Sequence, residues 1–215
     1  MSEQVVVAFM NKKGGVGKTT LSGLLADVLE AEGRNVTYLS VDPQGGGRES
    51  DDDVLPDSDC VVIDTPGHID ATSSQVISTA DIVVIPTIPG RINEESTRET
   101  IELAARANPT AIRVILLNEY RRGRKSTARM RDRFTRDGGD EIIFYVPFSS
   151  GVQNADDNSM SILDVKTPTA RAVVDSISSL AKVVGLVGRG ASYLDVLTVA
   201  ATSNAFVIRD MDGGE

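Results

Sequence analysis

The sequence predicts an α/β fold in which helices cover both faces of a largely parallel β-sheet. Short apolar runs alternate with amphipathic segments of helical spacing along the chain. A glycine-rich segment also lies directly between the first apolar run and the first helical segment. Sheets of this kind bind ligands beyond the carboxyl ends of their strands. We therefore expect a functional site at that edge of the sheet.

Six strands are expected where short apolar runs are bounded by Pro, Gly or Asp. They cover residues 5–10, 36–41, 60–63, 82–85, 114–117 and 142–146. Helices are expected where apolar side chains recur every three or four positions, at 18–32, 94–107 and 169–184. A further helix is expected in the Arg-rich stretch before the last strand, and Gly33 suits a left-handed cap on the first helix.

Length and composition limit the domain organisation. The 215 residues, 40% hydrophobic and 25% charged, suit one domain over 1–215. Within it, the apolar patch at 193–201 is either a helix closing the sheet edge or a dimer contact, so 190–215 is treated as an extension or a dimer element. Residues 45–58 and 210–215 have the composition of poorly ordered segments.

Several classes of protein are excluded by composition. A single cysteine, Cys60, cannot form an internal disulfide or a sulfur-ligated metal site, and its apolar neighbours indicate a small core residue. With His68 as the only histidine, a metal site built from several histidines is ruled out, and His68 itself is interpreted as a loop residue. No apolar run approaches the roughly 18 residues of a spanning helix, and the first residues do not resemble a signal peptide, so we expect a cytoplasmic protein. The net charge of −9 argues against nucleic-acid binding by the whole surface.

The glycine-rich segment is the strongest signal for chemistry. It comprises Gly14, Gly15, Val16, Gly17, Lys18, Thr19 and Thr20, preceded by Lys13. Glycines let backbone N–H groups converge on a phosphate, and the following helix adds its positive end. Lys18 is placed to reach the β- and γ-phosphates and the Thr19 hydroxyl to bind Mg²⁺. The strict P-loop pattern begins with a glycine, and here that position is Lys12.

Residues 13–20 resemble the deviant Walker A loop of ParA/MinD-type ATPases, a group of P-loop NTPases. The resemblance implies that Lys13 is the signature lysine, which contacts the phosphates bound by the other subunit of a nucleotide-sandwich dimer. Such a cation would stabilise charge during phosphoryl transfer. It would also make ATP hydrolysis depend on dimerisation. The catalytic residues implied are thus Lys13 and Lys18, with Asp42 described next.

Two further motifs extend the resemblance. The segment 41–45 is similar to the Asp-Pro-Gln-Gly switch of the ParA branch, so Asp42 is expected to orient the attacking water; the auxiliary aspartate of the family is Ser40 here. The apolar run ending at Asp64 resembles a Walker B strand, which implies that Asp64 holds Mg²⁺ together with Thr19. Relatives place an adenine-binding Asn where Asn118 lies and a base-contacting loop near Pro147 and Phe148.

A basic segment follows the strand that ends at Asn118. It carries eight positive charges in sixteen residues against one acid, Asp132. These cations could neutralise DNA phosphates without reading sequence, although a solvated helix face would have the same composition. The candidate DNA-binding residues are Arg121, Arg122, Arg124, Lys125, Arg129, Arg131, Arg133 and Arg136.

By resemblance, the sequence predicts a compact ParA-type partition ATPase without an N-terminal DNA-reading domain. It would use ATP and Mg²⁺, form a homodimer when ATP-bound, bind DNA non-specifically at the nucleoid and hydrolyse ATP when a ParB-like centromere-binding partner stimulates it. Membrane binding is not expected, because the acidic, glycine-rich residues 204–215 are unlike a basic amphipathic anchor. The alternatives are a MinD-like membrane-positioning ATPase, an ATP-dependent metabolic enzyme, and a binding module without hydrolysis. An iron–sulfur reductase would need cysteines that the chain lacks.

Overall fold

The computed structural model describes residues 4–41, 48–51, 53–55, 57–67, 71–136, 141–157, 160–203 and 206–207. Its strands are β1 (Val5–Phe9), β2 (Val36–Ser40), β3 (Cys60–Asp64), β4 (Ile82–Thr87), β5 (Ile112–Tyr120), β6 (Ile142–Pro147) and β7 (Phe206–Val207). Its helices are α1 (Lys18–Ala31), α2 (Ala71–Thr79), α3 (Arg91–Ala107), α4 (Lys125–Arg136), α5 (Ser150–Asp157), α6 (Pro168–Val187) and α7 (Tyr193–Thr202), with a 3₁₀ turn at Ile162–Asp164. The predictions on Asp42, His68, 210–215 and parts of 45–58 fall outside these described residues.

The strands form one sheet in the order β2-β3-β1-β4-β5-β6-β7. The first six are parallel to one another, and β7 pairs antiparallel with β6. This arrangement confirms the predicted fold class. Because β1 lies between β3 and β4, the segment that follows β1 leaves the sheet where the strand order changes direction, which is the usual ligand site of such sheets.

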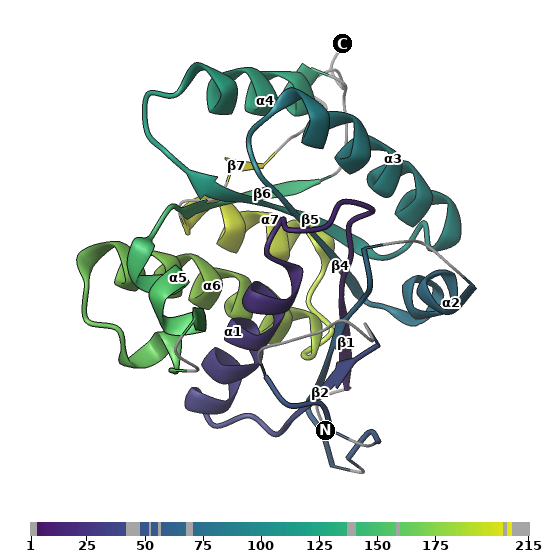
Figure 1. The fold of residues 1–215 in the computed structure, drawn as a ribbon. Coiled ribbons are helices and arrows are strands. Elements are labelled where there is room, and N and C mark those ends of the chain that lie inside the picture. Colours follow the sequence, from purple (N-terminus) through teal and green to yellow (C-terminus); the bar gives the residue numbers. More distant parts are fainter. Residues whose placement is uncertain are drawn as a thin grey trace.

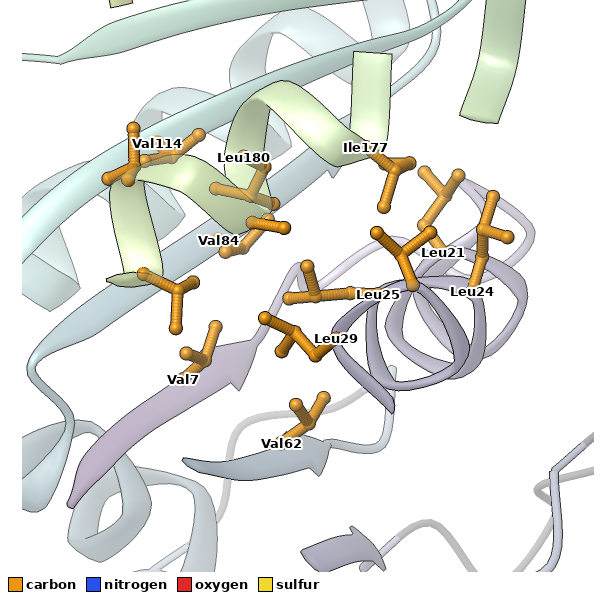
Figure 2. Packing of buried hydrophobic residues seen from close by; sticks show 14 of the residues in the cluster. Val7, Leu21, Leu24, Leu25, Leu29, Val62, Val84, Val114, Ile177 and Leu180 are labelled. Carbon is orange, nitrogen blue, oxygen red and sulfur yellow. The ribbon is translucent and has the colours of Figure 1, made fainter. Parts of the chain in front are cut away.

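One face of the sheet is covered by α1, α6 and α7. Four leucines of α1 recur at helical spacing, and they form one cluster with Ile177 and Leu180 of α6 and with side chains of the sheet (Figure 2). All of these side chains are at least 98% buried. Burial of each leucine contributes on the order of 2 kcal/mol relative to exposure. The leucines are Leu21, Leu24, Leu25 and Leu29. The amphipathic pattern thus fixes α1, and with it the segment at its amino end, against the sheet.

The opposite face is covered by α2, α3 and α4, as Figure 1 shows. Ile77 and Ala104 pack beneath α2 and α3 against the strand residues Val83 and Ile85. Under α4, Met130 and Phe134 make a separate apolar cluster. The expected helical cover on both faces is therefore present, with the Arg-rich helix on the side away from α1.

The chain also contains elements that its pattern did not predict. The sequence of α2 has only two large apolar side chains, Val76 and Ile77, and α5 has a glycine at its second position, so neither shows strong helical periodicity. Residues 193–202 do form a helix, α7, whose Val196 and Leu197 join the main core. The proposed dimer contact at this helix stays a prediction.

Cys60 occupies a core position at the start of β3. It is fully buried, and this burial raises the pKa of its thiol to about 12. A thiol with so high a pKa is inert at neutral pH. The interpretation of Cys60 as a small core residue therefore agrees with its surroundings.

Candidate functional site

The glycine-rich segment curls between the end of β1 and the start of α1. Gly15 and Gly17 have φ angles of +73° and +95°, in the left-handed region that side chains disfavour. Gly17 is the residue that precedes α1, and the first turn of α1 carries no acidic side chain. The amino end of the helix therefore keeps its partial positive charge, which suits the phosphate that the sequence predicts there.

The two lysines of this loop differ in their surroundings. Lys18 is only 7% exposed, and its Nζ donates a hydrogen bond to the carbonyl oxygen of Lys13 at 3.4 Å. The side chain of Lys13 is exposed, and within the described part of the chain it has no ion-pair partner. Lys18 thus points along its own loop, whereas Lys13 presents a cation to the outside.

Thr19 and Asp64 bring the loop together with the end of β3. The Thr19 hydroxyl donates to Oδ2 of Asp64 at 2.6 Å, and Asp64 is fully buried. Hydroxyl and carboxylate oxygens are the donors that Mg²⁺ prefers, so this pair fits the ion that the sequence assigned to it. Gly67 also lies close by, since a Cβ built on it would be 3.5 Å from the backbone nitrogen of Gly14.

No role for Asn11 was predicted from the sequence, yet its side chain fixes the start of the loop. The residue is fully buried. Its Nδ2 donates to the Pro86 carbonyl oxygen at 2.8 Å, and its Oδ1 accepts from the Lys13 backbone N–H and the Ser96 hydroxyl, each at 2.9 Å. This side chain therefore ties the backbone of Lys13 to β4 and α3. An amide residue directly after a buried apolar strand was the signal that could have revealed it.

A cavity of about 200 Å³ extends from the loop toward the ends of β5 and β6. It brings together the three residues that the sequence assigned to the base, although they are far from the loop along the chain. Its lining comprises Gly15, Gly17, Thr20, Leu21, Asn118, Glu119, Val146, Pro147, Phe148, Ser149, Val152, Gln153 and Val173. Glu119, Ser149, Val152 and Gln153 were not predicted as site residues, because no motif in the sequence includes these positions.

Asn118, which lines this cavity, is hydrogen-bonded to the glycine-rich loop. Its Nδ2 donates to the Val16 carbonyl oxygen at 3.0 Å, and its Oδ1 accepts from the backbone N–H of Glu119 at 2.9 Å. A Cβ built on Gly17 would be only 2.5 Å from the same Nδ2. Asn118 thus supports the phosphate loop, and the adenine contact proposed for it stays a prediction.

This close approach predicts a difference between two glycines. Gly17→Ala should lower the free energy of unfolding by more than Gly15→Ala, because both substitutions place a side chain at positive φ but only Gly17 also meets Asn118. The left-handed backbone alone costs roughly 1–2 kcal/mol. Urea unfolding of both variants without nucleotide measures the difference. Equal losses of unfolding free energy would show that the Asn118 side chain moves aside without cost.

The cations of the basic segment fall into two groups, those that contact another side chain and those that are exposed without an ion pair. The guanidinium of Arg121 lies 3.7 Å from the centroid of the Phe148 ring, and that of Arg131 pairs with Asp132 at 2.6 Å. Arg133 Nε lies 2.8 Å from Oε1 of Glu94 on α3. The other described cations are exposed and have no ion pair within the described part of the chain. These are Arg122, Arg124, Lys125 and Arg129. The side chain of Arg136 lies outside the described set.

A parallel sheet with a phosphate-type loop at its switch point, backed by a threonine–aspartate pair, defines a P-loop nucleotide-binding protein. The family model described as "CobQ/CobB/MinD/ParA nucleotide binding domain" matches residues 7–162. The chain belongs to this family, which confirms the resemblance seen in residues 13–20.

Curated relatives match part of the chain. It is 30% identical over 142 residues to "Maintenance of carboxysome distribution protein A" of Halothiobacillus neapolitanus, covering 53% of this chain and 65% of that protein. It is 32% identical over 114 residues to "Sporulation initiation inhibitor protein Soj" of Bacillus subtilis, covering 45% of each. The matched part thus spans less than two thirds of these relatives.

Solved structures share the fold. A McdA variant from Cyanothece in complex with ATP superposes with a TM-score of 0.65 at 14% identity, over 89% of this chain and 98% of that one. The septum site-determining protein MinD of Pyrococcus horikoshii, complexed with Mg-ADP, gives a TM-score of 0.67 at 14% identity, over 86% and 99%. Among the described residues, no helix combines the length and apolar character needed to cross a membrane.

Proposed function

We propose that this protein is a ParA-type ATPase that binds Mg²⁺-ATP, dimerises around it and associates with DNA to segregate or position a cargo. The observation that carries the proposal is the 2.6 Å contact of Thr19 with the buried Asp64, directly beside Lys18 and the amino end of α1. This arrangement supports the proposal, because a buried lysine lies next in the chain to a hydroxyl–carboxylate pair of the kind that Mg²⁺ prefers. The relative named for maintenance of carboxysome distribution supports a positioning role.

In this proposal the loop amides and Lys18 bind the β- and γ-phosphates of ATP. Thr19 and Asp64 would hold Mg²⁺, which when bound neutralises charge on the triphosphate oxygens. Thr20, Asn118, Pro147 and Phe148 would contact the remainder of the nucleotide. Thr20, Asn118, Pro147 and Phe148 line the cavity, and Lys18 and Thr19 belong to the loop beside it, which supports one bound molecule spanning both.

Hydrolysis requires a water molecule in line with the γ-phosphorus. Asp42 is proposed to orient this water. It follows Val41, whose backbone N–H donates to the Asp64 carbonyl oxygen at 2.9 Å; Asp42 itself lies outside the described residues. Lys13 of a second subunit would stabilise the charge that develops during transfer, which suits its exposed position.

The cargo and the partner are the finer part of the proposal. We infer non-specific DNA binding by the exposed cations of the basic segment and stimulation by a ParB-like protein, with the nucleoid as the site of action. Non-specific binding to DNA depends on phosphate neutralisation, which those side chains provide. The relatives leave a cargo other than DNA equally compatible with the same chemistry.

The test measures four quantities on one purified preparation: Mg²⁺-ATP affinity, mass in solution with and without ATP, retention on DNA, and phosphate release. We expect ATP to shift the mass from monomer to dimer and to increase DNA retention. ATP-dependent sedimentation with anionic liposomes in preference to DNA would instead favour the MinD-like alternative. Turnover stimulated by a small metabolite and unaffected by DNA would favour a metabolic enzyme, and ATP binding without any turnover would leave only a binding module.

Charge reversal locates the DNA-binding surface. Substituting Glu at Arg122, Arg124, Lys125 and Arg129 should weaken DNA retention and flatten its salt dependence, by about 0.9 in log–log slope for each DNA phosphate that is no longer neutralised. The matched control reverses four exposed cations outside this segment, Lys166, Arg171, Lys182 and Arg189, and so changes net charge equally. Equal weakening by both sets would mean that total charge, not this segment, governs retention.

A further inference from the structure

Phe148 lines the cavity and makes two contacts, one through its backbone and one through its ring. Its backbone N–H donates to the Tyr120 carbonyl oxygen at 3.0 Å, and the guanidinium of Arg121 lies 3.7 Å from its ring centroid. Phe148 lines the cavity, whereas Arg121 is not among the lining residues. Arg121 therefore covers the ring from outside the cavity.

An irregular turn produces this contact. The pairing of β5 with β6 shifts register between Leu117 and Tyr120. Glu119 within this bulge has a φ angle of +52°, and it is the only non-glycine residue with positive φ among those the structure describes. Such conformations are costly and cluster where a side chain must be re-aimed. Here the turn sends Asn118 to the phosphate loop and Arg121 to Phe148.

The neighbouring contacts limit how far the turn can move. The rings of Tyr120 and Tyr145 lie 5.0 Å apart, at an interplanar angle of 59°, so the residue before Arg121 is packed against β6. Asn118 is fixed by its bond to Val16. Arg121 thus closely follows two engaged side chains, those of Asn118 and Tyr120, and its stacking contact orders the one aromatic ring among the described residues that line the cavity.

We propose that Arg121 is a positioning residue of the nucleotide site, which holds Phe148 as a stacking surface for the base. This inference rests on the proposed nucleotide function and goes beyond it, because the sequence assigned Arg121 to DNA. A guanidinium is planar and stacks on aromatic faces. A ring fixed in this way loses less side-chain entropy when a flat heteroaromatic ligand packs on it. The role concerns the base and not the phosphates, which are proposed to bind the loop amides and Lys18.

The test compares Arg121→Ala with Arg122→Ala, which removes the same charge from the adjacent exposed position. Each variant is titrated with ATP and with inorganic tripolyphosphate, both with Mg²⁺, and is assayed for DNA retention. We expect Arg121→Ala to weaken ATP binding by about 3- to 30-fold, the range of a cation–π contact, and to leave tripolyphosphate binding unchanged. Arg122→Ala should leave the affinities for ATP and for tripolyphosphate unchanged. Arg121→Lys, which keeps the charge but not the planar group, should fall between wild type and Arg121→Ala.

Three results would overturn the inference while the proposed function survives. In the first, Arg121→Ala binds ATP as tightly as Arg122→Ala. In the second, it loses ATP and tripolyphosphate equally, which indicates a general disturbance of the site. In the third, it retains full ATP affinity but loses more DNA retention than Arg122→Ala, which assigns Arg121 to DNA. Failure of the wild-type protein to bind either ligand would instead overturn the proposed function and this inference with it.

Discussion

Replacing Lys18 with alanine is expected to lower the affinity for Mg²⁺-ATP by at least about 100-fold, because it leaves the triphosphate without its nearest buried cation. Removing one member of a desolvated charge pair typically costs about 2–5 kcal/mol, and about 3 kcal/mol corresponds to this factor. Lys18 is 7% exposed and begins α1, so water cannot easily take the place of its ammonium group when the side chain is removed. Equilibrium titration with a fluorescent ATP analogue measures the change.

A second variant separates charge from packing. Lys18→Met retains most of the aliphatic volume of the buried side chain and removes only the ammonium. It should unfold at nearly the wild-type temperature in the absence of nucleotide and bind ATP as poorly as Lys18→Ala. If Lys18→Met bound ATP like the wild type, the phosphate-binding role of Lys18 would be wrong.

The parallel sheet could be predicted from the sequence because its strands are buried on both faces. Continuous apolar runs such as the one at β3 have no other stable placement in a chain of this composition. The glycines at 14, 15 and 17 were equally informative, since two of them adopt φ angles that other residues disfavour. These features depend only on local sequence, and the elements they predict are present.

Elements with weak patterns were not predictable. The helix α2 is rich in Ser and Thr, and it is fixed by packing of Ile77 against strands distant in sequence rather than by its own helix propensity. The bulge at Glu119 was also hidden, because nothing in the local sequence requires a left-handed glutamate. Only the pairing of β5 with β6 imposes it.

In the candidate site, too, residues within a local motif were predictable and residues positioned by distant contacts were not. Residues within one motif, such as Lys18 and Thr19, were found because their spacing is fixed by the loop. Asn11 and the stacking of Arg121 on Phe148 were not, since their partners lie up to 86 residues away along the chain. Likewise, composition counted Arg133 as a free cation, whereas the fold places Glu94 beside it. Contacts between distant segments thus account for what the sequence did not reveal.

Substitution of Lys13 by alanine is expected to separate nucleotide binding from hydrolysis. The Lys13 side chain is exposed and has no ion pair within the described part of the chain, so the ATP affinity of the monomer should change by less than about threefold, a shift below about 1 kcal/mol. Turnover should fall by roughly 10²–10³, the usual loss when one group that stabilises transferred charge is removed. The measurement is phosphate release per chain over a range of protein concentrations.

The concentration dependence decides whether Lys13 acts on its own nucleotide or on that of a second subunit. If it acts across a dimer, wild-type turnover per chain rises with protein concentration, whereas that of Lys13→Ala stays low and flat. Lys12→Ala is the matched control, because it removes the adjacent exposed cation, which pairs with Glu99 at 2.9 Å. It should behave like the wild type. If Lys13→Ala instead lost ATP binding to the same extent as Lys18→Ala, Lys13 would act within its own subunit, since a cation needed only across a dimer cannot determine the affinity of a monomer.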